Sequence, residues 1–168
     1  MRWSKLKKRT EALFAPCVRG RVELRATTYR RAADKMGRGY ITIDGEEAWN
    51  APDAAWWAKE RDKIAHVAGR DGLTPPQAQP LAWDELAREG VHSLGGFYVA
   101  LEKFCDGDVE ANLRADDVLL RALAMCDRRV GKRRLAAMEV EGEHPLVQRL
   151  YELRIEAEGL RRRQAVPE

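Results

Sequence analysis

The chain has 168 residues, of which 45% are hydrophobic and 34% charged, and its formal net charge is only +3. The hydrophobic fraction excludes a disordered chain, and without an apolar run near 18 residues we expect no membrane span. Three scattered cysteines exclude a disulfide scaffold. We therefore expect a single domain over residues 1–168, and the cysteines together with the lack of a secretory signal favour a cytoplasmic protein.

The small net charge conceals a strong asymmetry along the chain. Residues 1–43 contain 12 basic and 3 acidic residues, which gives +9, whereas residues 44–125 contain 8 basic and 16 acidic residues, which gives −8. Residues 126–168 contribute +2, from 10 basic and 8 acidic residues. Either the basic N-terminal quarter contacts a polyanion, or it packs near the acidic middle and the two fields largely cancel.

The first fifty residues predict a helix followed by a three-stranded meander. Residues 3–15 place Trp3, Leu6 and Leu13 on one helical stripe and cover the remainder with lysine and arginine. A strand over 19–31 alternates apolar and polar residues, and further strands are predicted over 38–44 and 46–50. Asp44-Gly45 between these two favours a tight hairpin turn, and Gly37-Arg38-Gly39 is interpreted as a turn.

The rest of the chain predicts helices. The first, residues 54–68, would be capped by Asp53 and ended by Gly69. Four Gly and Pro residues favour a loop over 71–80, and Asp84 would cap a helix reaching about residue 105 with a break near Ser93. Further helices are predicted over 109–113, 117–128, 132–138 and 145–158.

These elements together predict an α+β fold. The N-terminal helix and the three-stranded antiparallel meander would pack with a C-terminal helical bundle. The same pattern predicts an α+β lobe over about 1–70, a helical lobe over about 81–160, and a linker over about 71–80.

One face of the predicted strands is rich in arginine and tyrosine. Guanidinium groups pair with phosphates and aromatic rings stack on unpaired bases, so this pattern is typical of a nucleic-acid surface. The alternatives are a solvated sheet face or one covered by an acidic helix of the same chain. The candidate nucleic-acid-binding residues are Arg21, Arg25, Tyr29, Arg31, Arg38 and Tyr40.

Two adjacent tryptophans form a second candidate site. Trp56 and Trp57 would be about 100° apart around a helix, so both cannot face one core. At least one of them would be exposed, which suggests a protein partner, although core filling also explains tryptophans.

No motif predicts chemistry. The three histidines, His66, His92 and His144, are far apart, and neither a metal-ligand spacing nor a nucleophile elbow is present. Cys17 lies among cations that could stabilise a thiolate, although a structural thiol is the favoured interpretation. We therefore expect no metal and no cofactor, and an enzyme ranks behind the two binding functions.

Several stretches resemble a small family of uncharacterised bacterial proteins. They are MRWSKLK at residues 1–7, RGRVE at 19–23, TYR at 28–30 and GRGYITIDGE at 37–46, with further similarity around 121–133 and 144–147. The resemblance implies a bacterial protein and carries no activity or site residue with it.

The leading hypothesis is therefore non-enzymatic binding of nucleic acid or another polyanion through the basic strand face. The alternative is a protein-interaction or accessory module that uses the helical lobe. The sequence does not favour any oligomeric state.

Overall fold

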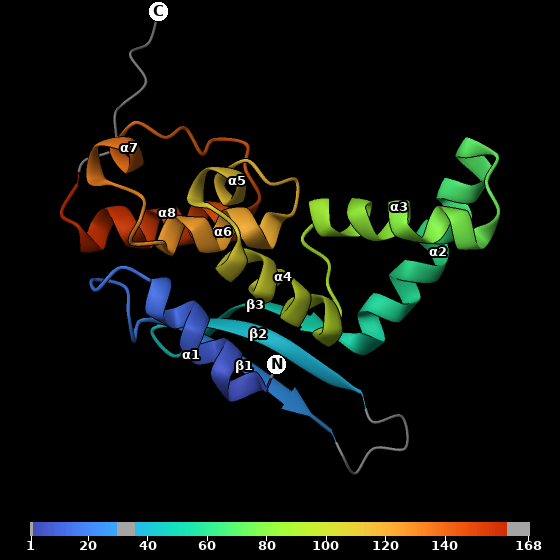
Figure 1. The fold of residues 1–168 in the computed structure, drawn as a ribbon, viewed down its shortest axis with the longest axis horizontal. Coiled ribbons are helices and arrows are strands. Elements are labelled where there is room, and N and C mark those ends of the chain that lie inside the picture. Colours follow the sequence, from blue (N-terminus) through green and yellow to red (C-terminus); the bar gives the residue numbers. More distant parts are fainter. Residues whose placement is uncertain (1, 30–35, 161–168) are drawn as a thin grey trace, which may run out of the picture.

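The computed structural model describes residues 2–29 and 36–160. Helix α1 (Trp3–Leu13) precedes an antiparallel sheet in the order β1 (Val22–Thr28), β2 (Gly37–Ile43) and β3 (Glu46–Pro52). The helices that follow confirm the predicted α+β class (Figure 1). They are α2 (Asp53–Asp71), α3 (Pro75–Arg88), α4 (Leu94–Asp106), α5 (Val109–Leu113), α6 (Val118–Cys126), α7 (Lys132–Ala136) and α8 (Pro145–Ala157).

The sheet follows the alternation of its sequence. Register pairs Val22 with Ile43 and Leu24 with Ile41, so these apolar side chains share the inner face. The turn that joins β2 to β3 has φ of 51° at Asp44 and 88° at Gly45, as a hairpin over Asp-Gly requires. The sequence therefore located both the strands and the turn correctly.

Gly37 and Gly39 belong to β2 and do not form the turn expected for Gly37-Arg38-Gly39. A β-carbon on Gly39 would collide with the Phe97 ring of α4, and one on Gly37 would lie 2.6 Å from Leu94 Cδ2. Glycine is present here because α4 packs directly against the backbone of the strand.

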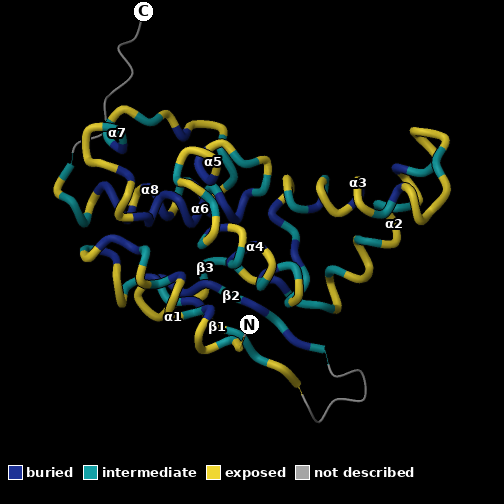
Figure 2. Tube along the Cα trace, in the orientation of Figure 1, coloured by how far each residue is buried: buried dark blue, intermediate teal, exposed yellow. Residues whose placement is uncertain are grey.

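Helix α6 forms the centre of the main core, and eight of its nine residues are buried, all except Arg121. It packs against α8 on one side and against α4 on the other, and α4 in turn lies on the inner face of the sheet. Figure 2 shows this buried interior running through the body of the molecule. Within the described residues, no helix is both long and apolar enough to cross a membrane.

Helices α2 and α3 form an antiparallel arm that projects from this body (Figure 1). The arm has its own small cluster of buried residues, Val67, Ala78 and Ala82, and most of its surface is exposed (Figure 2). We call these two helices the arm. Helix α2 ends at Asp71 and α3 begins at Pro75, so the loop predicted over 71–80 is wrong except at residues 72–74.

The start of α3 explains this error. Pro75 and Pro76 occupy the first helical positions, where a backbone N–H has no partner inside the helix, so proline is compatible with them. Thr74 and Gln77 form a capping box around them. Only Pro80 lies further inside the helix and removes one hydrogen bond.

Three predicted helix ends are also wrong. Asp53 is the first residue of α2, and its carboxylate accepts from Gly37 N–H and Leu94 N–H, both at 2.8 Å, so it joins β2 to the start of α4. Helix α2 passes Gly69 and ends at Gly72, which adopts the left-handed conformation. Asp84 lies inside α3 and does not cap it. The break predicted near Ser93 is confirmed, because α3 ends at Arg88 and Ser93 caps α4. The division into lobes at 1–70 and 81–160 stays a prediction.

Candidate interaction surfaces

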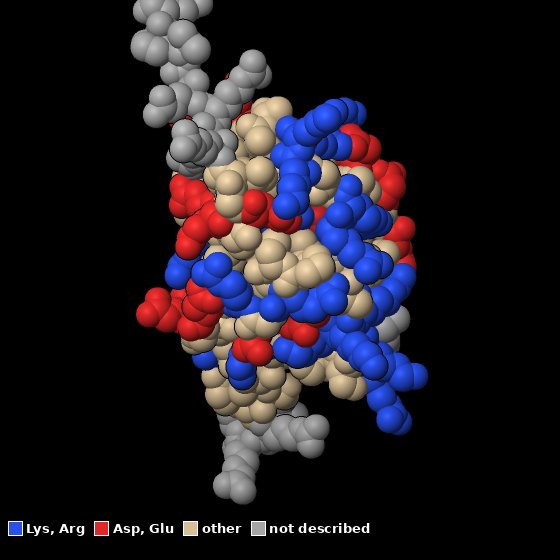
Figure 3. Space-filling model, turned by 90° about the vertical axis from the view of Figure 1, so that its left-hand side faces the viewer, with Lys and Arg blue, Asp and Glu red and all other residues tan. Residues whose placement is uncertain are grey.

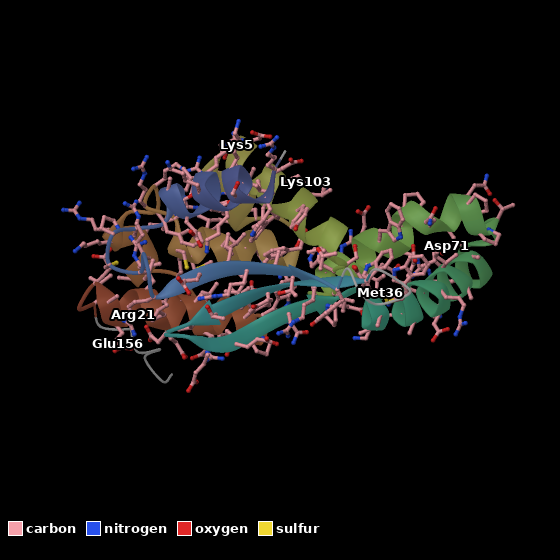
Figure 4. All side chains as sticks on the ribbon, turned by 90° about the horizontal axis from the view of Figure 1, so that it is seen from below. Lys5, Arg21, Met36, Asp71, Lys103 and Glu156 are labelled. Atoms are coloured by element: carbon pink, nitrogen blue, oxygen red, sulfur yellow. The ribbon has the colours of Figure 1, made fainter. Side chains whose placement is uncertain are left out.

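The outer face of the sheet carries the arginines and tyrosines that the sequence singled out. Register places Arg25 opposite Tyr40 and Thr27 opposite Arg38, all on the side away from α4. Seen from below, no described helix covers this face (Figure 4). The acidic helices of the middle segment therefore do not shield it.

Each described arginine of this face already pairs with a carboxylate. Arg21 forms two bonds of 2.9 and 2.7 Å to Asp44, and Arg25 bonds to Glu23 at 2.6 Å. Arg38 bonds to Glu47 at 2.7 Å, and its guanidinium carbon lies 4.4 Å from the centre of the Tyr40 ring. The carboxylates come from β1, the hairpin turn and β3, so the sheet neutralises its own basic face.

The same pairs lower the pKa of two carboxyl groups. Hydrogen bonding to Arg21 lowers the pKa of Asp44, and hydrogen bonding to Arg25 lowers the pKa of Glu23. Both carboxylates therefore stay charged against their arginines at neutral pH. Tyr29 is 49% exposed at the end of β1, and Arg31 lies outside the described residues.

Cations without a carboxylate partner lie elsewhere. In the described ranges, none of the cations Lys5, Lys8, Arg19, Arg128 and Arg133 forms an ion pair. The first two come from the outer side of α1, and the Arg128 N–H donates to Leu13 O at 2.8 Å, which joins the segment after α6 to the end of α1. Figure 3 shows lysine and arginine gathered along one side of this part of the molecule. We call these five residues the basic band.

Helix α1 also protects the free edge of β1. Lys7 Nζ donates to Leu24 O at 2.8 Å, and Leu24 N–H donates to Glu11 Oε1 at 3.0 Å. Two side chains of α1 thereby satisfy backbone groups that an edge strand would otherwise leave open. The exposed cations of α1 are thus held on a rigid, doubly anchored helix.

A third surface lies where the arm meets the body. The Trp56 and Trp83 rings, from α2 and α3, have centroids 6.1 Å apart, and Trp57 meets Trp56 edge-on at 6.5 Å. A groove of about 390 Å³ runs between Trp56 and Trp83 on the arm and Val99 on α4. The arm is thus aromatic where it faces the body.

The sequence identified two of these tryptophans and missed the third. Trp83 precedes Asp84, where the sequence predicts the start of a helix, so no helix is predicted for it. In the structure it lies in α3 and its ring faces Trp56. The Thr74-Pro75-Pro76-Gln77 capping signal would have predicted α3 and with it this juxtaposition. The other two tryptophans, Trp3 and Trp49, fill the main core around Phe97.

The histidines His92 and His144 and the thiol of Cys17 have structural partners, although His92 also lines the groove. His92 is buried and its Nε2 lies 3.1 Å from Asp117 Oδ1, and His144 Nδ1 accepts from Leu146 N–H and caps α8. Burial and a hydrogen bond to Glu158 raise the pKa of Cys17, so the thiolate suggested by its cationic neighbours is not stabilised. Among the described residues, no group of three acidic, histidine or cysteine side chains is placed to hold a metal.

The family model of the SF0329 protein family matches residues 2–155. The chain belongs to this family. The match includes α1, the sheet, the arm and all but the last turn of α8, so the three surfaces described above all lie within the family region. Neither the curated proteins nor the solved structures contain a match to the chain.

Proposed function

We propose that the protein is an interaction module that binds a protein partner through the arm. The observation that carries this proposal is the distribution of exposed large apolar side chains. Trp57, Leu81 and Trp83 on the arm are 61%, 43% and 46% exposed, and Val99 on the facing wall of α4 is 51% exposed. Within the described residues, Tyr29 alone has comparable exposure elsewhere.

Large apolar side chains are costly to leave in water and favourable to bury. Contiguous apolar surface that is rimmed by polar residues marks interaction sites, and tryptophan is enriched among the residues that carry binding energy. The arm rests on a small core of its own, so its exposed residues contribute little to holding the body together. A partner that covers them would gain apolar burial without disturbing the fold.

The test is a capture experiment with the purified full chain and extract of its native host. A partner recovered in stoichiometric amount should be lost when Trp57→Ala and Leu81→Ala are combined, because both side chains are exposed and can be truncated without opening a core. The control is Arg25→Gln on the sheet, which should leave capture unchanged. Equal capture by the arm variant and the wild type would contradict the proposal.

A second candidate function is the binding of nucleic acid or another polyanion. It is favoured by the basic band, whose five cations are unpaired within the described residues and lie on rigid, exposed backbone. The sheet face remains part of this hypothesis through Arg21, Arg25, Tyr29, Arg31, Arg38 and Tyr40. Retention on heparin that falls steeply with salt would support it, because each phosphate contact releases counterions.

We place both functions in the reducing cytoplasm of a bacterium. The three cysteines are free thiols, two of them half-buried and one buried, which suits such a compartment. The bacterial origin rests on the sequence resemblance described above. Mass spectrometry of fractionated native cells would detect the protein with the cytoplasmic fraction.

A further inference from the structure

The arm contains two carboxylates that form no ion pair within the described residues, unlike most acidic side chains around them. Most acidic side chains of the arm are matched: Arg70 pairs with Asp71 and Glu85, and Lys63 pairs with Glu89. Asp53 accepts two backbone N–H groups. Within the described part of the arm, Glu60 and Asp84 form no ion pair with lysine or arginine.

These two carboxylates lie beside the tryptophans. Glu60 Oε1 accepts the indole N–H of Trp83 at 2.6 Å, and this bond fixes the ring on α3. Asp84 lines the groove together with Trp56 and Trp83. Uncompensated negative charge therefore coincides with two aromatic rings, one of which is 46% exposed.

We propose that this groove binds a lysine or arginine side chain presented by a basic segment of the protein partner. The inference rests on the proposed function and names the chemistry of the partner. Indole has the most negative face of the aromatic side chains, so it attracts a cation placed over it. The counter-charge would come from Asp84, which lines the groove, and from Glu60, which lies outside the lining at the Trp83 N–H. Val99 and the indoles would cover the apolar stem of the cation.

The groove also has a cationic wall, which defines the competing outcome. Lys103 lies on α4, on the opposite side of the groove from Trp83. An acidic partner would use Lys103 and avoid Glu60 and Asp84. Whether the groove prefers a positively or a negatively charged peptide therefore decides between a basic and an acidic partner.

The test uses the indole N–H signals in the nuclear magnetic resonance spectrum of the ¹⁵N-labelled full chain. The probe is a short peptide of alternating lysine and alanine, and its counterpart has glutamate in place of lysine. The lysine peptide should shift the signals of Trp56 and Trp83 and leave that of Trp3 unchanged, because Trp3 packs against the main core. A shift produced only by the glutamate peptide, or no shift with either, would overturn the proposal.

Charge variants then test the contact directly. Combining Glu60→Gln with Asp84→Asn removes both charges, while the glutamine still offers an oxygen to the Trp83 N–H, so the arm should stay folded. Affinity for the lysine peptide should fall about tenfold, since each exposed ion pair contributes up to about 1 kcal/mol. The control is Asp62→Asn, which removes one charge, from an 80% exposed side chain of α2, where the test variant removes two. Equal loss in both variants would mean that general attraction, and not this groove, holds the peptide.

The two proposals fail separately. If the combined Trp57→Ala and Leu81→Ala variant loses the partner but the lysine peptide does not bind, the interaction module stands and the cation site is wrong. If the peptide binds as expected but capture of a partner does not depend on Trp57 and Leu81, the module is wrong and the groove is a cation site in its own right.

Discussion

At the scale of single residues, Gly39 shows how closely α4 packs on the sheet. Its missing side chain leaves room for Phe97, which is completely buried. Gly39→Ala should lower the free energy of unfolding by about 3 kcal/mol, because neither the β2 backbone nor the ring can move away in a close-packed core. Urea denaturation measures this change.

Gly69 provides the matched control for this substitution. It lies on the exposed side of α2, and a β-carbon there would have nothing within 4 Å. Gly69→Ala should therefore raise stability by about 0.5–1 kcal/mol through better helix propensity. If both variants lost stability, the cost would not come from the contact with Phe97.

His144 makes stability depend on pH. Burial, with a smaller effect of the nearby Arg121, lowers the pKa of His144, and its neutral Nδ1 accepts the Leu146 N–H that begins α8. The unfolded chain therefore binds this proton more readily than the folded chain does. Stability should be full above the ordinary histidine pKa of about 6.5 and should fall as the pH drops through it.

Two variants separate the cap from the titration. His144→Asn keeps a capping oxygen, but its side chain does not titrate in this range. It should therefore abolish the part of the stability loss at low pH that comes from His144. His144→Ala should cost about 1 kcal/mol at every pH, because the cap itself is lost. Thermal unfolding between pH 5 and pH 8 distinguishes them, and an unchanged acid loss in His144→Asn would assign the effect to another group.

At the scale of elements, the arm depends on the first turn of α3. Pro75 and Pro76 have no backbone N–H, so the open donors in this first turn are the N–H groups of Thr74 and Gln77. The capping box between these two residues satisfies both. Thr74→Ala should cost about 1 kcal/mol, and hydrogen exchange should speed up in the arm while α6 stays protected. Faster exchange throughout the body would show that the arm and the core unfold together.

The sequence predicted some elements well and others poorly for identifiable reasons. Strands β1 and β2 alternate cleanly, and Asp44-Gly45 allows one turn type, so the meander was predictable. The sequence does not predict the part of α3 before Asp84, because prolines usually break helices, although Pro75 and Pro76 occupy positions that need no donor. The alternation also predicted which face of the sheet carries the arginines. Their carboxylate partners could not be predicted, because Arg38 reaches Glu47 across a shift in strand register after Ile41.

At the scale of the whole molecule, charge is balanced locally on the sheet and unbalanced elsewhere. Helix α1 of the basic N-terminal quarter packs on α4 of the acidic middle, where Arg9 pairs with Asp106 at 2.6 Å, so the quarter does not offer uniformly free cations. Its sheet arginines pair with carboxylates of the same sheet, while Lys5 and Lys8 on α1 form no ion pair within the described residues. The net charges of +9 over residues 1–43 and −8 over residues 44–125 therefore do not form one basic and one acidic face of the folded molecule.

Two matched variants follow from this arrangement, each removing three positive charges. One changes paired arginines of the sheet, and the other changes unpaired cations of the basic band. The first combines Arg21→Gln, Arg25→Gln and Arg38→Gln, and the second combines Lys5→Gln, Lys8→Gln and Arg128→Gln.

Heparin retention and DNA binding at several salt concentrations compare these variants. A phosphate must displace a carboxylate to reach the sheet arginines, whereas the band cations have no carboxylate partner. The band variant should therefore lose more affinity, and its salt slope should fall by about 0.9 for each phosphate contact removed from duplex DNA. A larger loss in the sheet variant would instead favour the arginine and tyrosine face that the sequence indicated. If neither variant differed from the wild type, polyanion binding through these six cations would be excluded.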